Sequence, residues 1–277
     1  TEMAAVLGTG EIWLRVPETI RIEINGKLPA NVMSKDVILR IIGDLTAAGA
    51  TYRALEFTGD TVEAMSLSSR MTMANMGIEA GAKCALFAPD EKTAEYLGIE
   101  LTAAERALAG DADAPCERVL RYRAEDFVPV MALPSNVDHV AAIRDLEPVA
   151  IDQVFLGSCT NGRLEDLMAA AEILKGKHIA PFVKLIVTPA SRKIWEEAEA
   201  NGTLAILSAA GAMITHPSCG LCCGRTGGIL SDGERVVATN NRNFLGRMGS
   251  SKVEIYLASP KSAAASALTG RLTEATC

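Results

Sequence analysis

The sequence of 277 residues predicts an α/β fold, a three-layer α/β/α arrangement with mainly parallel sheets. Short apolar segments of strand length alternate with longer segments whose apolar residues recur at helical spacing. Such alternation favours parallel sheets, because a parallel connection needs a crossover that is usually a helix. The apolar fraction of 49% is ample for a core. At about 150 residues per domain, the length fits one large domain or two ordinary ones.

In the first half, residues 20–24 alternate between apolar and charged side chains and predict a strand. Asn25-Gly26 predicts the turn that follows it. Ser34 is the predicted N-cap of a helix with Asp36 in its first turn. Its apolar residues lie at helical spacing at positions 37, 38, 41, 42 and 45. Further predicted strands are 54–58 and 84–87, and further predicted helices are 69–80 and 90–97. Residues 98–127 are rich in alanine and in charged residues, and residues 111–115 are predicted as a loop.

The Pro-containing segment 129–148 predicts a connection between two domains, which we assign to residues 1–132 and 133–277. After this segment, strands and helices follow one another regularly. The predicted strands are 153–156, 182–187, 211–215, 235–239 and 253–257. The predicted helices are 164–174, 191–200, 203–210 and 262–269.

The net charge of −7 argues against bulk nucleic-acid binding, which needs a basic surface. The longest nearly apolar run, 204–214, is too short to span a bilayer. The start of the chain lacks the basic region of a secretory signal, so we expect a cytoplasmic protein without a membrane partner.

Residues 133–277 carry no net charge, and three of their arginines lie near the cysteines in the sequence: Arg225, Arg242 and Arg247. This pattern fits either chance or a positive site for an anionic ligand.

Seven cysteines occur in the chain, at positions 84, 116, 159, 219, 222, 223 and 277. Their odd number in a long chain argues against a secreted disulfide framework. Cys159 follows one predicted strand and the pair Cys219 and Cys222 follows another, and the carboxyl ends of parallel strands share one edge of a sheet. These three thiolates fit a four-iron, four-sulfur cluster with one free iron better than structural zinc, which takes four ligands. A redox dithiol and a set of buried structural thiols are alternatives. Cys223 is interpreted as a packing residue.

At these residues the sequence resembles the aconitase superfamily, specifically the large subunits of isopropylmalate and homoaconitate dehydratases. The resemblance extends in order along nearly the whole chain. The matching segments are 16–19, 35–39, 56–59, 74–82, 88–93, 154–167, 217–224, 239–249 and 256–260.

The resemblance implies roles for eight residues. Cys159, Cys219 and Cys222 would bind a [4Fe-4S] cluster, whose open iron would act as a Lewis acid on the substrate hydroxyl. Asn241, Arg242 and Arg247 would contact the cluster and a di- or tricarboxylate substrate, since the arginine fork suits a carboxylate. Asn75 and Glu79 would be catalytic, with Glu79 near the departing hydroxyl as ligand or proton donor.

The sequence also departs from this family. Relatives carry a preceding region with an Asp-Ser-His segment and further histidines, whereas this chain has only His139, His178 and His216. We therefore expect a fragment, a proteolysed product or one part of a split enzyme, inactive alone. A separate small, swivelling subunit would supply the base and another arginine in a heterodimer or heterotetramer. Arg225-Thr226 replaces a pair that is often Gly-His, and Cys223 is often Leu or Met.

The expected reaction is a hydro-lyase isomerisation of 3-isopropylmalate and 2-isopropylmalate by removal and return of water, in leucine biosynthesis. Homoaconitate, in lysine biosynthesis, and a methylmalate-type acid are alternative substrates. Two non-enzymatic alternatives are an iron-sulfur redox or regulatory module without turnover and a structural fragment without its cluster. An electron-transfer protein would usually need a fourth protein ligand.

Overall fold

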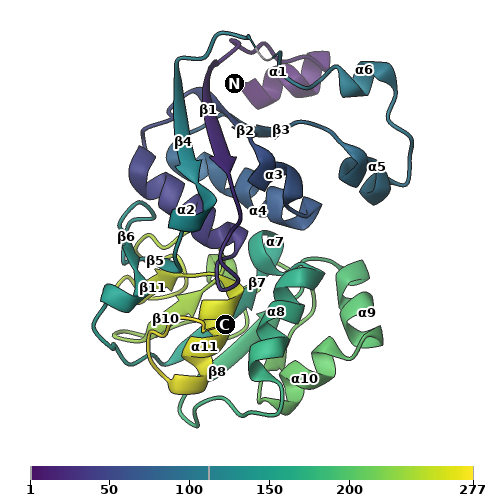
Figure 1. Cartoon of the computed structure of the whole chain (residues 1–277). Helices are drawn as coiled ribbons and strands as arrows, with labels where there is room; N and C mark the ends of the chain where they lie inside the picture. Colours follow the sequence, from purple (N-terminus) through teal and green to yellow (C-terminus); the bar gives the residue numbers. More distant parts are fainter. Residues whose placement is uncertain (1, 112, 277) are drawn as a thin grey trace.

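The computed structural model describes residues 2–111 and 113–276 and contains two sheets, one above the other in Figure 1. The first sheet has the order β3-β2-β1-β4 and is parallel throughout. Its strands are β1 (Glu18–Asn25), β2 (Arg53–Thr58), β3 (Cys84–Phe87) and β4 (Arg118–Arg123). The second sheet has the order β6-β5-β11-β10-β7-β8-β9, with antiparallel pairing only around β5. The prediction of mainly parallel α/β sheets is confirmed.

The alternation of β1 separates its two faces. Ile20, Ile22 and Ile24 are fully buried, whereas Arg21 lies on the opposite face and pairs with Glu56 of β2 at 2.8 Å. The buried face packs on helices α2 (Ser34–Leu45), α3 (Asp60–Ala64) and α4 (Leu67–Met76), and a 3-10 helix, Gly77–Ala80, continues α4. The apolar positions predicted for α2 are all buried.

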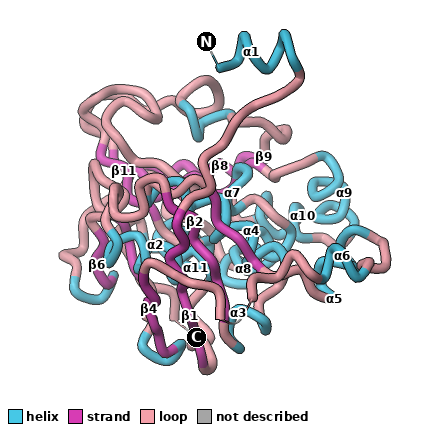
Figure 2. Tube along the Cα trace, turned by 90° about the horizontal axis from the view of Figure 1, so that it is seen from above, coloured by secondary structure: helices cyan, strands magenta, loops and turns pink. Residues whose placement is uncertain are grey.

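Two short helices and one terminal helix lie outside this packing. They are α5 (Glu91–Leu97), which confirms the predicted helix 90–97, and α6 (Ala103–Arg106) and α1 (Glu2–Thr9), which were not predicted. Helix α1 projects from the body of the molecule (Figure 2), and none of its described residues is buried.

The second sheet is formed by strands β5 (Val130–Ala132), β6 (Val140–Ala142), β7 (Gln153–Gly157), β8 (Lys184–Thr188), β9 (Met213–Ile214), β10 (Arg235–Ala238) and β11 (Glu254–Leu257). Helices α8 (Leu164–Leu174), α9 (Arg192–Ala200), α10 (Thr203–Ala209) and α11 (Pro260–Thr269) follow its strands, and α7 (Ser158–Asn161) is a single turn. One face of this sheet forms an apolar cluster with α8, α10 and α11.

We call each sheet together with the helices packed on it a unit. The opposite face of the second sheet shares an apolar cluster with the first unit. Phe155 and Ile186 belong to the same cluster as Ile38 of α2 and Phe57 of β2. Helix α2 also contacts β5, and α4 contacts α7. The two units therefore share a continuous core, and helix α4 lies beside the end of β7.

The chain passes from one sheet to the other between Arg123 and Val130, a few residues before the predicted domain boundary at 132/133, which stays a prediction. Strand β4 lies in a region where no strand was predicted. Three of its six residues are arginines and none of the six is buried, so no run of apolar residues marked it as a strand. Strands β5 and β6 lie within the predicted connection. Among the described residues, no helix is long and apolar enough to cross a membrane.

Candidate functional site

The first part of the candidate site is the turn after strand β7. All five residues of β7 are buried, and the chain then reverses at Gly157 with φ +142° and Ser158 with φ +69°. A Cβ on Gly157 would lie 2.1 Å from the carbonyl oxygen of Thr188 on β8, so only glycine fits. The turn opens α7 and leaves Cys159 exposed at the carboxyl edge of the sheet.

Helix α4 holds this turn from the first unit. Asn75 Nδ2 donates to Cys159 Sγ over 3.6 Å, and Thr160 Oγ1 donates to Asn75 Oδ1 over 3.2 Å. One turn earlier on α4, Thr72 Oγ1 donates to the carbonyl of Thr160 over 2.9 Å. The predicted catalytic Asn75 thus lies directly beside the predicted ligand Cys159.

The second cysteine loop follows strand β9. Thr188 at the end of β8 and Thr215 after β9 share a hydroxyl contact of 2.6 Å, which places this loop at the same edge. Cys219 is exposed and immediately precedes the 3-10 helix Gly220–Cys223, in which Cys222 is buried. Cys223 donates through its thiol to the carbonyl of Gly220 over 3.6 Å, a contact within the turn itself.

The segment after strand β10 contacts Cys222. Arg247 Nη2 lies 3.8 Å from Cys222 Sγ, and Asn240 Nδ2 donates to the Cys222 carbonyl over 3.4 Å. The Nε of Arg247 is buried and has no hydrogen-bond partner within residues 2–111 and 113–276. This guanidinium therefore retains a donor for an additional acceptor.

Glu79 brings the remaining predicted residues together across the two units. Its Oε1 accepts from Asn241 Nδ2 at 3.0 Å and from Arg242 Nε at 2.8 Å. The Glu79 side chain is 11% exposed, while that of Arg242 is 38% exposed. The arrangement fixes one edge of the Arg242 guanidinium and leaves part of it open to a ligand.

The described residues contain no group of three histidine, cysteine, aspartate or glutamate side chains close enough to hold a metal ion. The three predicted cysteines lie on two loops at one sheet edge without forming a compact triad. Their chemistry nevertheless fits a sulfur-ligated group, because thiolates prefer iron-sulfur clusters. Asn75 and Arg247 direct N–H donors at two of the three sulfurs, as the outer shell of such a site requires.

Two buried residues at this site, Lys35 and Asp166, have no sequence pattern that marks them as functional. Lys35 is completely buried, and its Nζ donates to the carbonyls of Thr239 at 2.9 Å and Asn240 at 2.6 Å. Burial lowers the pKa of Lys35 to about 7. Asp166 is also buried and accepts from Asn161 Nδ2 at 3.1 Å. The segment containing Lys35 matches the family, but an exposed lysine is the ordinary expectation.

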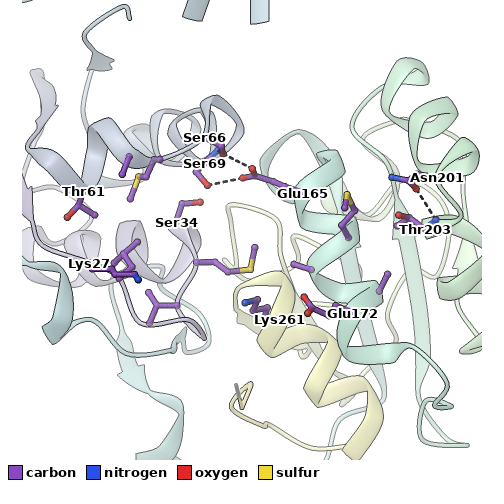
Figure 3. Close-up of a pocket in the computed structure, with 18 of the residues that line it drawn as sticks. Lys27, Ser34, Thr61, Ser66, Ser69, Glu165, Glu172, Asn201, Thr203 and Lys261 are labelled. Carbon is purple, nitrogen blue, oxygen red and sulfur yellow. Dashed lines mark hydrogen bonds between the residues drawn. The ribbon is translucent and has the colours of Figure 1, made fainter. Parts of the chain in front are cut away.

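A cavity of about 910 Å³ lies between the two units (Figure 3), and no cysteine among the described residues lines it. It is lined by residues of α4, α8 and α11 among others, and by none of the eight predicted site residues. On its wall, Glu165 accepts from both Ser66 Oγ and Ser69 Oγ. This contact joins α4 to the start of α8 and is distinct from the cysteine edge.

Comparison with known proteins gives extensive matches. The family model of aconitase (aconitate hydratase) matches residues 1–150 and 143–270. The 3-isopropylmalate dehydratase large subunit 1 of Methanopyrus kandleri is 50% identical over 274 residues, which cover 99% of this chain and 66% of the relative. Large subunit 2 of Archaeoglobus fulgidus is 46% identical over 275 residues, with coverages of 99% and 66%.

The large subunit of Heliobacterium modesticaldum is 45% identical over 272 residues, with coverages of 98% and 65%. The chain thus spans slightly less than two thirds of the length of these relatives. Among solved structures, the holo-form of aconitase X from Thermococcus kodakaraensis aligns with 86% of this chain and 53% of its own, at 14% identity and a TM-score of 0.46.

Proposed function

This chain belongs to the aconitase family, and we propose from that membership that it is part of the large subunit of a hydro-lyase. The proposed reaction interconverts 3-isopropylmalate and 2-isopropylmalate by dehydration and rehydration, a step of leucine biosynthesis. The names of the relatives, which are 45–50% identical, support this substrate. The observation that carries the proposal is the contact of Glu79 in the first unit with Asn241 and Arg242 in the second.

We propose that Cys159, Cys219 and Cys222 hold a [4Fe-4S] cluster. Three thiolate ligands on loops at one sheet edge, two of them facing N–H donors, support this assignment. When bound, the cluster supplies a Lewis-acid iron that makes a substrate hydroxyl a better leaving group.

The arginines of this chain bind and orient the substrate in this proposal. The exposed part of Arg242 and the buried, unsatisfied Nε of Arg247 offer donors that suit a carboxylate. Glu79 Oε1 keeps Arg242 in place, while Oε2 makes no hydrogen bond to the described residues. That free oxygen is the atom at which Glu79 would exchange a proton with the substrate hydroxyl.

We further propose a small subunit as partner, because the relatives are named large subunits. All six described cysteines are unpaired, which fits a reducing compartment such as the cytoplasm. Since the chain covers about 65% of its relatives, we assign the activity to the assembled protein and expect no turnover by residues 1–277 alone. Assays of the chain with and without the small subunit, using isopropylmalate, homoaconitate and methylmalate, test both points.

The cluster assignment is tested by anaerobic reconstitution followed by iron and sulfide analysis. We expect about four irons per parent chain, and a marked loss in Cys159→Ser, Cys219→Ser and Cys222→Ser. Cys84→Ser and Cys116→Ser are matched controls, because these thiols lie outside the two cysteine loops and should leave the iron content unchanged. Parent-like iron binding by Cys159→Ser and Cys219→Ser would exclude the proposed ligands.

A further inference from the structure

Lys35 is a buried cation that links the two sheet units. It stands in the first turn of α2, yet its ammonium reaches the end of β10 in the second sheet and donates to two backbone carbonyls. No carboxylate among the described residues lies within ion-pair distance of it. Burying an ammonium without a paired carboxylate is costly, so a compensating interaction is expected at this position.

The two carbonyls that Lys35 binds belong to the residues that join both cysteine loops. Thr239 Oγ1 accepts from the backbone N–H of Gly157 at 2.8 Å, and Gly157 begins the turn that presents Cys159. Asn240 Nδ2 donates to the carbonyl of Cys222. A displacement of residues 239–240 would therefore move both loops together.

The same junction leads to the proposed substrate residues. Asn241 and Arg242 follow directly and contact Glu79. Burial lowers the pKa of Lys35, while the acidic groups Asp166, Cys222 and Glu79, when ionised, act in the opposite direction. Anionic groups gathered at this edge would stabilise the ammonium, and the ammonium would stabilise them in return.

We propose that Lys35 is a positioning residue, which holds both cysteine loops in a cluster-binding arrangement through the Thr239 and Asn240 carbonyls and places a positive charge near Cys222. This inference rests on the proposed function. Lys35 contacts none of the reacting atoms and acts only through the backbone of residues 239–240 and through its charge.

The test compares three variants of the full chain. Lys35→Met removes donors and charge at similar length, and Lys35→Gln keeps a donor without the charge. Lys92→Met is the matched control, because Lys92 also donates to two backbone carbonyls, those of Glu63 and Met65, within the first unit. For each variant we would measure iron binding after anaerobic reconstitution, the urea midpoint of the metal-free chain, and amide hydrogen exchange.

We expect Lys35→Met to bind iron at least about tenfold more weakly, the effect of losing an outer-shell partner. Its urea midpoint should stay close to that of the parent, because removal of the buried charge offsets the loss of two hydrogen bonds to carbonyls. Amides of 157–160 and 239–242 should exchange faster. Lys35→Gln should lie between Lys35→Met and the parent, and Lys92→Met should bind iron as the parent does.

Parent-like iron binding in Lys35→Met, or a loss of iron only in proportion to unfolded protein, would overturn the proposal. If Lys35→Met does not fold, the same criteria apply to Lys35→Gln. If the parent itself binds no iron, the proposed function fails, and hydrogen exchange of the metal-free chains then decides whether Lys35 positions the loops. Unchanged exchange at 157–160 and 239–242 would show that it does not.

Discussion

Asn75 and Cys159 come from different sheet units and meet through a hydrogen bond of 3.6 Å between Nδ2 and Sγ. The amide is held in this orientation because Thr160 Oγ1 donates to its Oδ1. An N–H directed at a sulfur stabilises negative charge there, as outer-shell donors of metal sites do. The contact couples the position of helix α4 to the state of the Cys159 thiol.

Replacing Asn75 with aspartate should weaken iron binding by about tenfold or more. A carboxylate in place of the amide would repel the Cys159 thiolate instead of donating to it. Iron titration after anaerobic reconstitution measures the effect. Asn201→Asp is the control, because Asn201 uses its Oδ1 to accept from the backbone N–H of Thr203, a role aspartate can keep. Equal iron affinities in the two variants would contradict a role for Asn75 at the sulfur.

Replacing Glu79 with glutamine should lower turnover of the enzyme assembled with its small subunit by about 100-fold, the range of a lost proton-transfer group. The amide cannot exchange a proton at Oε2 and pairs less well with Arg242. Glu56→Gln is the matched control, because Glu56 also pairs with an arginine, Arg21, at 2.8 Å. A Glu79→Gln enzyme with parental turnover would exclude the proposed role of the carboxylate.

Local patterns predicted most of the fold. The helix with apolar positions 37–45 and the strand around Ile22 were correct, because helical spacing or alternation of apolar residues reports a buried face directly. The N-cap of the helix is Met33, and Ser34, the predicted cap, is its first residue. Strand β4 was not predicted, because none of its residues is buried and arginines occupy three of its six positions. The position of a strand in a sheet depends on its neighbours as well as on its own pattern.

The candidate site was only partly predictable. The strand-helix order indicated that Cys159 and Cys222 would share one sheet edge, since parallel strands end on the same side. Nothing in the local sequence of Asn75 or Glu79 indicated contact with the second unit, and only the family resemblance suggested these residues. The burial of Lys35 arises from packing between the two units, which brings together residues 204 positions apart in the sequence, as the Lys35–Thr239 hydrogen bond shows.

Stability should depend on pH through Asp166. Burial is the main reason why the pKa of Asp166 is raised to about 7, from the ordinary 3.8. Between these pH values the folded state keeps a proton that the unfolded state has released. The Asp166 contribution to the free energy of unfolding is therefore fully present below about pH 4 and falls by up to about 1.4 kcal/mol per pH unit until about pH 7.

Urea unfolding between pH 4 and 8 tests this expectation. Asp166→Asn should lose less stability than the parent as the pH rises through this window, because its amide does not titrate. Asp232→Asn is the control and should leave the slope unchanged, since hydrogen bonds from Lys252 and Ser250 lower the pKa of Asp232 below its ordinary 3.8 and both states are ionised in this window. Identical slopes for Asp166→Asn and the parent would show that Asp166 does not carry the effect.

Gly157→Ala should unfold the turn that presents Cys159. The methyl group would lie 2.1 Å from the Thr188 carbonyl, in a backbone conformation with φ +142° that alanine rarely adopts. Gly176→Ala is the matched control, because Gly176 also has a positive φ, +71°, but no atom within 4 Å of its added Cβ. We expect the free energy of unfolding to fall by about 1 kcal/mol in Gly176→Ala and by about 3 kcal/mol or more in Gly157→Ala, where strain and a backbone clash combine.

Urea unfolding measures both costs, and reconstitution should show iron loss only in Gly157→Ala. Equal costs, or parental iron binding by Gly157→Ala, would mean that the turn can rearrange without moving Cys159.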